Sequence, residues 1–304
     1  MGLIKLVTFE NSSKINRLGV LLENSVLDIC SIDKTIPSDM KSFLSNKETN
    51  KWNNLVKIIK ENTNTNQYHH SLDNVRFKSP IDDPEKVIGI GLNYREHAIE
   101  GGFNIPTEPV VFSKFSSSII GPNESIVKPK SSDQVDYEVE LVVIIGKTAK
   151  NVDKESALDY VAGYTVGNDV SARDWQLKKN NNQWLLGKTF DTFAPIGPSI
   201  LVNPSLASLY SGETFLDPNN LNLKCILNGQ VMQDSSTKDF IFNVQEVVSY
   251  LSNIFTLKPG DVIFTGTPQG VGFTRNPPIF LKPGDVVECQ VEHIGSLIND
   301  VKEL

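Results

Sequence analysis

Three acidic residues occur in two segments that could bring them together. In the run Asp136-Tyr137-Glu138-Val139-Glu140, Glu138 and Glu140 stand two positions apart, directly before a long apolar stretch. On a β-strand such residues point to the same face, roughly 6.5–7 Å apart. Two carboxylates at the mouth of a buried strand require a cation. From the pattern alone, a solvated strand edge with alternating Glu and Val remains the alternative.

Asp169 supplies a third carboxylate at the end of a second strand-like run, which begins at Ala162. A carboxylate in this place suits a metal ligand or a catalytic group, and an aspartate that caps a helix is the alternative. Three hard oxygen ligands without nearby Cys or His favour Mg²⁺, Mn²⁺ or Ca²⁺ over zinc. A divalent metal on Glu138, Glu140 and Asp169, completed by water or substrate oxygens, is therefore one hypothesis.

His97 and Glu100 are candidates for acid–base chemistry because they lie three residues apart, which makes them neighbours on a helical turn. A carboxylate beside an imidazole orients the ring and raises its basicity, as a general base requires. The following Gly101-Gly102 would give a hinge if this helix were a lid. A pair of surface residues is the alternative. The preceding Gly89 and Gly91 lack the third glycine of a dinucleotide fingerprint, so no nucleotide site is predicted.

Two lysines stand in otherwise apolar segments. Lys188 lies in Trp184–Phe193, and Lys114 follows Val111-Phe112-Ser113. A lysine in such a place either extends its charge to the surface or points at an anion. A glycine-containing loop, Thr265-Gly266-Thr267-Pro268, follows another apolar run and allows close backbone approach to a ligand, although it could equally be a plain tight turn.

The elements that must position these residues are mainly strands. Period-two and apolar runs predict strands at the nine segments Lys5–Phe9, Arg17–Leu22, Val87–Gly91, Pro109–Phe112, Val139–Ile145, Tyr164–Val166, Leu221–Leu227, Val262–Thr265 and Val286–Val291. Helical spacing predicts helices at Trp52–Lys60, Glu155–Val161 and Asn243–Phe255. The repeated Leu-Lys-Pro-Gly-Asp-Val at positions 257 and 281 predicts two equivalent turns, each leading into a strand. The pattern indicates a β-rich α+β protein with a small N-terminal α/β unit at 1–80 and a catalytic domain at 85–304.

The amino-acid composition limits the kinds of molecule that the protein can bind. The 304 residues carry a formal net charge of −7, which argues against nucleic acid and anionic membrane as partners. Three widely spaced cysteines indicate neither a disulfide framework nor a zinc cluster. The N-terminal residues lack the features of a signal or transit peptide, so a cytoplasmic location is expected and a mitochondrial one less so.

Taken in order, these motifs resemble those of the fumarylacetoacetate hydrolase family, and among its branches that of fumarylacetoacetate hydrolase domain-containing protein 2. The resemblance is dense from about residue 85 onward and fainter before. The matching segments are Gly91–Tyr94 with His97 and Glu100, Glu108–Lys114, Asp136–Glu140, Asp169–Gln176, Gly187–Asp191 and Thr265–Pro268.

The resemblance implies a fold of rolled, mixed β-sheets and a homodimer. It implies Mg²⁺ or a similar ion on Glu138, Glu140 and Asp169, and an activating pair, His97 and Glu100, on a mobile lid. Lys188 becomes a cation on the substrate side. The supporting substrate contacts that the resemblance and the sequence together suggest are Lys114, Arg173, Gln176 and Thr267. Fumarylacetoacetate hydrolase itself has a larger N-terminal domain, which makes another small oxo-acid the expected substrate.

Three functions follow from these parts. A site that stabilises an enolate could hydrolyse the C–C bond of an acylpyruvate, which is the main expectation. The same site could interconvert the keto and enol forms of oxaloacetate, or decarboxylate it. A catalytically silent homologue that binds a metal or ligand is the third possibility, and the complete set of carboxylates, imidazole and lysine argues against it.

Overall fold

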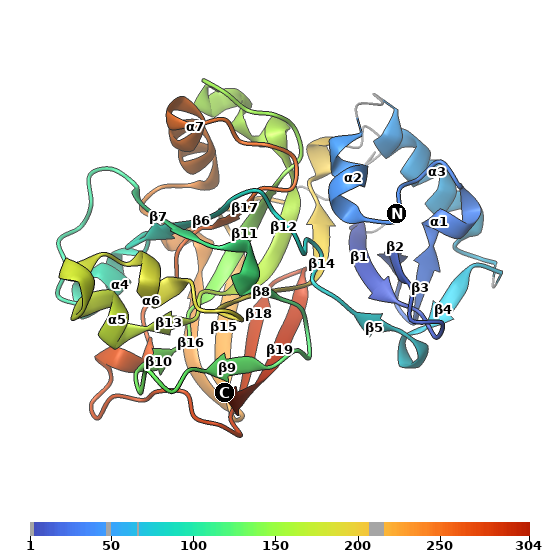
Figure 1. Ribbon diagram of the computed structural model, residues 1–304. Coiled ribbons are helices and arrows are strands. Elements are labelled where there is room, and N and C mark those ends of the chain that lie inside the picture. The colour runs from blue at the N-terminus through green and yellow to red at the C-terminus, as the bar shows by residue number, and fades with distance from the viewer. Residues whose placement is uncertain (1–2, 47–49, 66, 207–215) are drawn as a thin grey trace.

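The computed structural model describes residues 3–46, 50–65, 67–206 and 216–304. Figure 1 shows a larger β-rich body joined to the N-terminal segment, drawn in blue, by a sheet that runs through both. The expected β-rich fold with mixed sheets is confirmed, because parallel and antiparallel pairs occur in the same sheets. Among the described residues, no helix has the length and apolar composition needed to cross a lipid bilayer.

The largest sheet has the strand order β4-β3-β2-β1-β14-β12-β11-β17-β6-β7. Its strands are β1 (Lys5–Glu10), β2 (Asn16–Leu21), β3 (Ser25–Asp28), β4 (His69–Ser71), β6 (Val87–Gly91), β7 (Val110–Lys114), β11 (Val139–Ile145), β12 (Val161–Asn168), β14 (Ala194–Val202) and β17 (Val262–Phe264), with β5 (Arg76–Phe77) and β8 (Ile119–Ile120) beside β1 and β14. The N-terminal strands join the rest through the antiparallel pair β1–β14. The boundary expected near residues 80–85 falls between β5 and β6, and a separate N-terminal unit stays a prediction.

A second sheet covers part of the first and has the order β16-β15-β18-β19-β9. Its strands are β9 (Ile126–Lys128), β15 (Asn222–Leu227), β16 (Gln230–Ser236), β18 (Val286–Val291) and β19 (Gly295–Glu303). The two repeated turns begin strands of different sheets, β17 and β18. Gly260 and Gly284 have φ values of 85° and 93° there, as the predicted turns require.

Helices are short. They are α1 (Ile29–Ile32), α2 (Met40–Ser45), α3 (Lys51–Asn62), α4 (Arg95–Glu100), α5 (Arg173–Leu177), α6 (Leu185–Lys188) and α7 (Val244–Ile254). The two predicted amphipathic helices are confirmed as α3 and α7. Asn243 begins α7 with a capping box, in which its side chain and that of Glu246 each accept the other's backbone N–H. The helix predicted at 155–161 is present as a 3₁₀ helix, Lys154–Tyr160. It ends one residue earlier than predicted, because Val161 already belongs to β12, where it pairs with Ile145.

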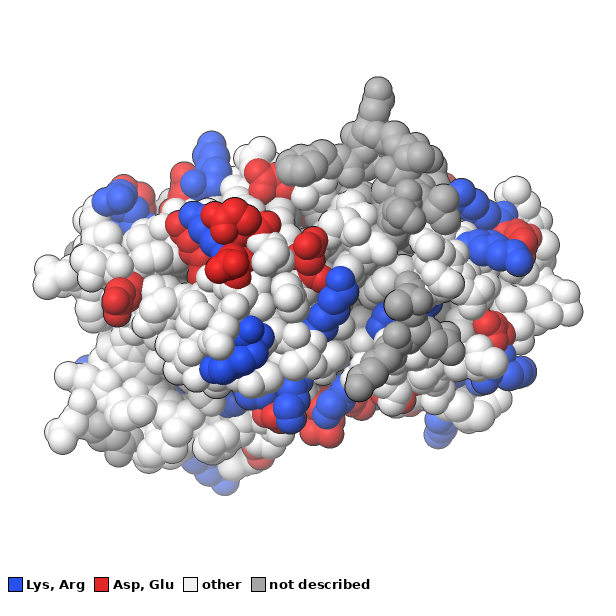
Figure 2. All heavy atoms as spheres, turned by 90° about the horizontal axis from the view of Figure 1, so that it is seen from above, with Lys and Arg blue, Asp and Glu red and all other residues white. Residues whose placement is uncertain are grey.

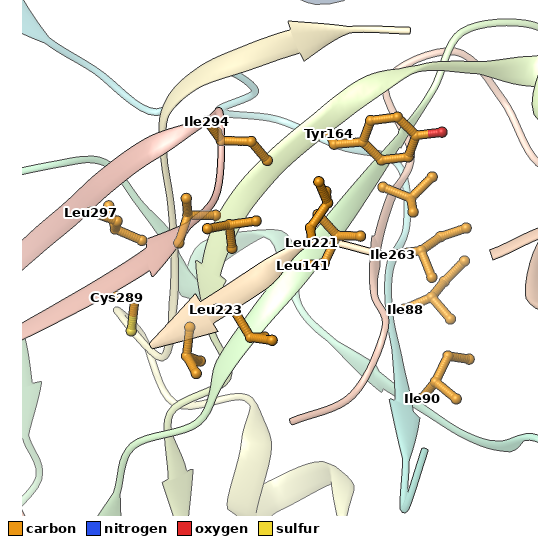
Figure 3. Close-up of a cluster of buried hydrophobic side chains, with 14 of the residues drawn as sticks. Ile88, Ile90, Leu141, Tyr164, Leu221, Leu223, Ile263, Cys289, Ile294 and Leu297 are labelled. Carbon is orange, nitrogen blue, oxygen red and sulfur yellow. The ribbon is translucent and has the colours of Figure 1, made fainter. Parts of the chain in front are cut away.

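Strand β11 separates the two halves of the interior. Its odd-numbered residues from Val139 to Ile145 join a core that also contains residues of the second sheet and of α7. Figure 3 shows part of this core, where Leu141 lies among Leu223 of the second sheet, Ile263 of the first sheet and Leu221, which directly precedes β15. Val142 and Ile144 point the other way and join the core that contains the N-terminal helices. Because side chains alternate along a strand, Glu138 and Glu140 share the face of Val142.

Charge is distributed without a dominant sign on the face seen from above. Figure 2 shows Lys and Arg interspersed there with Asp and Glu, and wide areas without either. The three cysteines are buried free thiols.

Candidate active site

The three predicted carboxylates meet at the start of β11. Glu138 and Glu140 flank its first residue, and Asp169 follows the last residue of the antiparallel neighbour β12. The Asp169 backbone N–H donates to the Glu138 carbonyl at 2.9 Å, which fixes the two chains at this end of the ladder. Ligand oxygens of Glu138, Glu140 and Asp169 lie within 4.8 Å of one another, and all three residues are buried.

These carboxylates are neutralised unequally. Glu138 accepts from Lys188 Nζ at 2.7 Å and forms an ion pair with Arg173, whose Nη2 lies 2.6 Å from Glu138 Oε1. Burial opposes its ionisation, but Lys188 and Arg173 outweigh burial and hold the pKa of Glu138 well below its usual range. Glu140 has no such partner in the described part of the chain: its Oε2 accepts from the Gly266 backbone N–H at 2.7 Å. Burial and the neighbouring charges of Asp169 and Glu138 therefore raise the pKa of Glu140 far above the usual value.

Lys188 bridges two of the carboxylates. Its Nζ lies 2.7 Å from both Glu138 Oε2 and Asp169 Oδ2, and 4.9 Å from the centre of the Phe112 ring. Burial alone would lower the pKa of Lys188, but the attraction of Asp169 and Glu138 raises it, so the ammonium is charged. A charged ammonium beside these carboxylates can offset negative charge on an oxygen of a bound oxo-acid.

Lys114 takes a different place. Its fully buried ammonium lies 2.6 Å from Asp169 Oδ1 and donates to the carbonyls of Val170 at 3.1 Å and Phe193 at 2.8 Å, and also to that of Lys188. Lys114 is not among the residues that line the cavity described below. Its contacts therefore support a role in holding Asp169 and the chain around Lys188, rather than in contacting substrate.

This contrast gives a paired prediction. Lys188→Met keeps the apolar stem against Phe112 and removes the charge, so turnover should fall roughly 10²–10³-fold, as for loss of one oxyanion-stabilising group. Lys114→Met removes one of the two cationic partners of buried Asp169 and the donor to three carbonyls, so the free energy of unfolding should fall by about 3–5 kcal/mol. Thermal unfolding and initial rates, measured on both variants, check this. Equal rates in Lys188→Met and wild type would show that Lys188 is structural.

Arg173 and Gln176 lie together on α5, beside Glu138. Arg173 donates from Nε to Asp136 Oδ2 at 2.9 Å and from Nη1 to Gln176 Oε1 at 2.8 Å. Asp136 also accepts from the backbone N–H groups of Gly272 and Phe273 at 2.8 and 3.0 Å. Arg173 is thus held between Asp136, Glu138 and Gln176. The side-chain amide nitrogen of Gln176 has no hydrogen-bond partner among the described residues and can donate to a substrate.

The spacing of His97 and Glu100 does bring them into contact on α4. His97 Nδ1 lies 3.0 Å from Glu100 Oε1, and Glu100 also accepts from the Gly270 backbone N–H at 3.0 Å. With Glu100 ionised, Nδ1 carries the hydrogen, which leaves Nε2 with a free lone pair. Glu100 further accepts from Thr274 Oγ1 at 3.3 Å, so one carboxylate orients the imidazole and fastens α4 to the 270–274 segment.

The loop after β17 contributes backbone more than side chains. Gly266 has a φ of 104°, and an added Cβ would lie 2.7 Å from Asn93 Cβ, so glycine is required where the N–H meets Glu140. Thr267 donates to the Val139 carbonyl at 2.9 Å and accepts from Gln233 Nε2 at 2.9 Å. Gln233 Oε1 in turn accepts from the Val139 N–H at 3.0 Å. Gln233, on β16, thus ties this loop to the strand between the two glutamates.

These groups enclose a narrow cavity of about 20 Å³. Its polar lining is His97, Glu138, Glu140, Asp169, Arg173, Gln176, Lys188 and Thr267. Its apolar lining includes Leu92, Phe103, Phe112, Leu177, Trp184 and Phe273. Of the site residues predicted from the sequence, Glu100 and Lys114 are the two outside this lining, and each binds a residue within it.

The donor set fits a hard divalent cation. Three buried carboxylate oxygens converge, and one of the carboxylates, Glu140, has no cationic partner among the described residues. Mg²⁺ and Mn²⁺ prefer such all-oxygen surroundings and keep further positions for water or substrate. Such an ion would supply Lewis-acid stabilisation of negative charge on a 2-oxo group, while Lys188 and His97 stand in the same cavity for charge and proton transfer.

Sequence comparison agrees with this arrangement. Residues 86–302 match the model of the fumarylacetoacetate (FAA) hydrolase C-terminal family. The fumarylacetoacetate hydrolase domain-containing protein 2 homolog of Dictyostelium discoideum is 64% identical over 99% of this chain and 98% of its own. The protein of Xenopus laevis named oxaloacetate tautomerase fahd2, mitochondrial, is 42% identical over 98% of this chain and 90% of its own.

Solved structures share the fold. Maleylpyruvate hydrolase from Sphingobium sp. SYK-6, solved with manganese(II) and pyruvate, superposes with a TM-score of 0.77 at 26% identity, covering 98% of this chain and 99% of that one. Family model, full-length relatives and fold therefore agree, and the chain belongs to the fumarylacetoacetate hydrolase family.

Proposed function

We propose that this protein is a divalent-metal-dependent oxaloacetate tautomerase, which interconverts the keto and enol forms of a small oxo-acid. The observation that carries the proposal is one buried cavity that holds three converging carboxylates, the Lys188 ammonium and the imidazole of His97. The full-length relative in Xenopus laevis named as an oxaloacetate tautomerase supports this reaction over the hydrolysis expected first from the sequence.

The residues of this chain would have the following roles in the reaction. Glu138, Glu140 and Asp169 hold the ion, and Lys114 and Arg173 keep two of these carboxylates in place. In the keto-to-enol direction, His97 Nε2 takes a proton from C3 while Lys188 offsets the charge that moves to the C2 oxygen. The imidazolium then returns a proton to that oxygen. No bond between carbon atoms is broken or formed and no atom is lost, so the reaction is a net isomerisation.

The groups of the cavity match what tautomerisation needs, which is one base and one charge at the oxygen. Hydrolysis needs an attacking water in addition. Acylpyruvate hydrolysis remains the second candidate because maleylpyruvate hydrolase shares the fold and was solved with pyruvate. Oxaloacetate decarboxylation would use the same ion and lysine without a base.

A substrate comparison tests the proposal. The Mg²⁺-loaded protein is given the enol form of oxaloacetate, the keto form and acetylpyruvate in separate assays. We expect enol consumption far above the rate without protein, with pyruvate formed no faster than in that control and acetylpyruvate left intact. Rapid cleavage of acetylpyruvate with no acceleration of enol consumption would reverse the order of the two candidates.

Two further expectations concern the oligomeric state of the protein and its location in the cell. A homodimer is predicted from the family resemblance, and light scattering of the purified protein measures the oligomeric state. The sequence predicts a cytoplasmic protein, whereas the relative in Xenopus laevis is named as mitochondrial. The name of that relative favours a mitochondrial location, and fractionation of cells that express the natural chain tests it.

A further inference from the structure

Gly89 and Gly91, which do not belong to a nucleotide motif, serve the site in another way. They stand two residues apart on β6 and so face the same side of the sheet. Neither is among the glycines with positive φ, so backbone freedom does not explain them. A Cβ on Gly89 would lie 2.1 Å from Phe112 Cζ, and one on Gly91 would lie 2.3 Å from Trp184 Cζ3. Each glycine makes space for one aromatic ring.

The two seated rings form a continuous wall. Phe112 and Trp184 meet edge to face with centroids 5.8 Å apart, and both line the cavity. The Phe112 ring is centred 4.9 Å from Lys188 Nζ, which itself lies 2.7 Å from Glu138 and from Asp169. The wall therefore faces the carboxylates across little more than the lysine head group. A substrate chelated at the carboxylates would therefore have this wall beside its remaining carbons.

We propose that Phe112 and Trp184, seated on Gly89 and Gly91, determine substrate specificity by limiting chain length, so that the site selects short, unbranched 2-oxo acids. The inference rests on the proposed function, since it concerns the substrate of the same cavity. It gives the Gly-x-Gly segment a steric role. The two glycines determine how close to β6 the rings lie, and the rings determine how long a substrate carbon chain the site accepts. Excess methylene groups meet rings that already lie against the backbone of β6 and cannot move further toward that strand.

Binding of a graded ligand series tests this without relying on turnover. The Mg²⁺-loaded protein is titrated calorimetrically with oxalate, 2-oxoglutarate and 2-oxoadipate, of which the last two differ by one methylene. In wild type, 2-oxoadipate should bind at least about 10-fold more weakly than 2-oxoglutarate, the usual discrimination for one methylene. In Trp184→Ala this gap should close, with oxalate affinity within about twofold of wild type. Leu186→Ala is the matched control, because Leu186 lies on the same segment, is 44% exposed and does not line the cavity.

A double-mutant cycle tests the seating itself. Gly91→Ala alone should force the indole forward and weaken binding of 2-oxoglutarate at least about 10-fold. In the Trp184→Ala background the added methyl group has nothing to displace, so Gly91→Ala should then change affinity less than twofold. Phe112→Leu, combined with Gly89→Ala, provides an independent pair, and thermal unfolding confirms that each variant is folded.

Two results would overturn the proposal. One is a discrimination between 2-oxoglutarate and 2-oxoadipate that is the same in Trp184→Ala and wild type. The other is an equal effect of Gly91→Ala with and without the indole. Enol–keto conversion is measured on the same preparations: if wild type shows none while the binding series behaves as expected, the proposed reaction is wrong and the steric limit stands.

Discussion

Glu140→Gln should abolish metal-dependent turnover and leave the protein at least as stable as wild type. Glu140 has no cationic partner among the described residues, and Glu138 and Asp169 repel its charge. Glutamine keeps an oxygen that accepts from the Gly266 N–H and removes that repulsion, so the free energy of unfolding should not fall. The ion loses one of three carboxylates, so its affinity should fall by at least about 100-fold, more than the usual loss of a residue that only supports a ligand.

Calorimetric titration with Mn²⁺, together with thermal unfolding, measures both effects. Glu138→Gln is the matched control, because Glu138 pairs with both Lys188 and Arg173. Its loss removes one of the two carboxylate partners of each cation, which keep Asp169 and Asp136, and should lower the free energy of unfolding by about 3 kcal/mol. Unchanged Mn²⁺ affinity in Glu140→Gln would remove this residue from the metal site.

His97→Ala should reduce enol–keto conversion by roughly 10²–10⁴-fold, the usual effect of losing a general base. The imidazole is the group in the cavity whose Nε2 is left free by the contact of Nδ1 with Glu100. Glu100→Gln should reduce the rate less, because the imidazole remains. This variant should also loosen α4, since Glu100 accepts from Gly270 and Thr274, and hydrogen exchange at residues 95–100 should rise.

His97→Ala also separates the reactions. Decarboxylation of chelated oxaloacetate needs no base, so any such activity should persist in part in this variant, whereas proton transfer should not. Initial rates of enol loss and of pyruvate formation, followed side by side, provide the comparison. Wild-type rates of enol loss in His97→Ala would place the base elsewhere and remove the lid assignment with it.

The sequence predicted the parts of this site that depend on local spacing. Alternation along β11 was enough to place Glu138 and Glu140 on one face, and helical spacing was enough to bring His97 to Glu100. Asp169 could be included in the predicted metal site because it follows a strand-like run that begins at Ala162. The apolar faces of α3 and α7 were predictable for the same reason.

Contacts between distant segments could not be predicted in this way. Gln233 lies on a strand of the second sheet, and nothing in its local sequence indicates that it joins Val139 to Thr267. The sequence could not show that Lys114 binds backbone carbonyls, because those come from the chain around residues 170, 188 and 193. The steric role of Gly89 and Gly91 depends on the rings of Phe112, on β7, and Trp184, at the start of α6, which are distant in the sequence.

Proton exchange at C3 of oxaloacetate tests the central claim most directly. Keto oxaloacetate is mixed with the Mg²⁺-loaded protein in D₂O, and the C3 proton signal and the pyruvate signal are followed together by NMR. We expect deuterium to enter C3 much faster than without protein, His97→Ala to return the rate close to that control, and pyruvate to form no faster than in the control. Acceleration of pyruvate formation with C3 exchange no faster than in the protein-free control would contradict tautomerase activity.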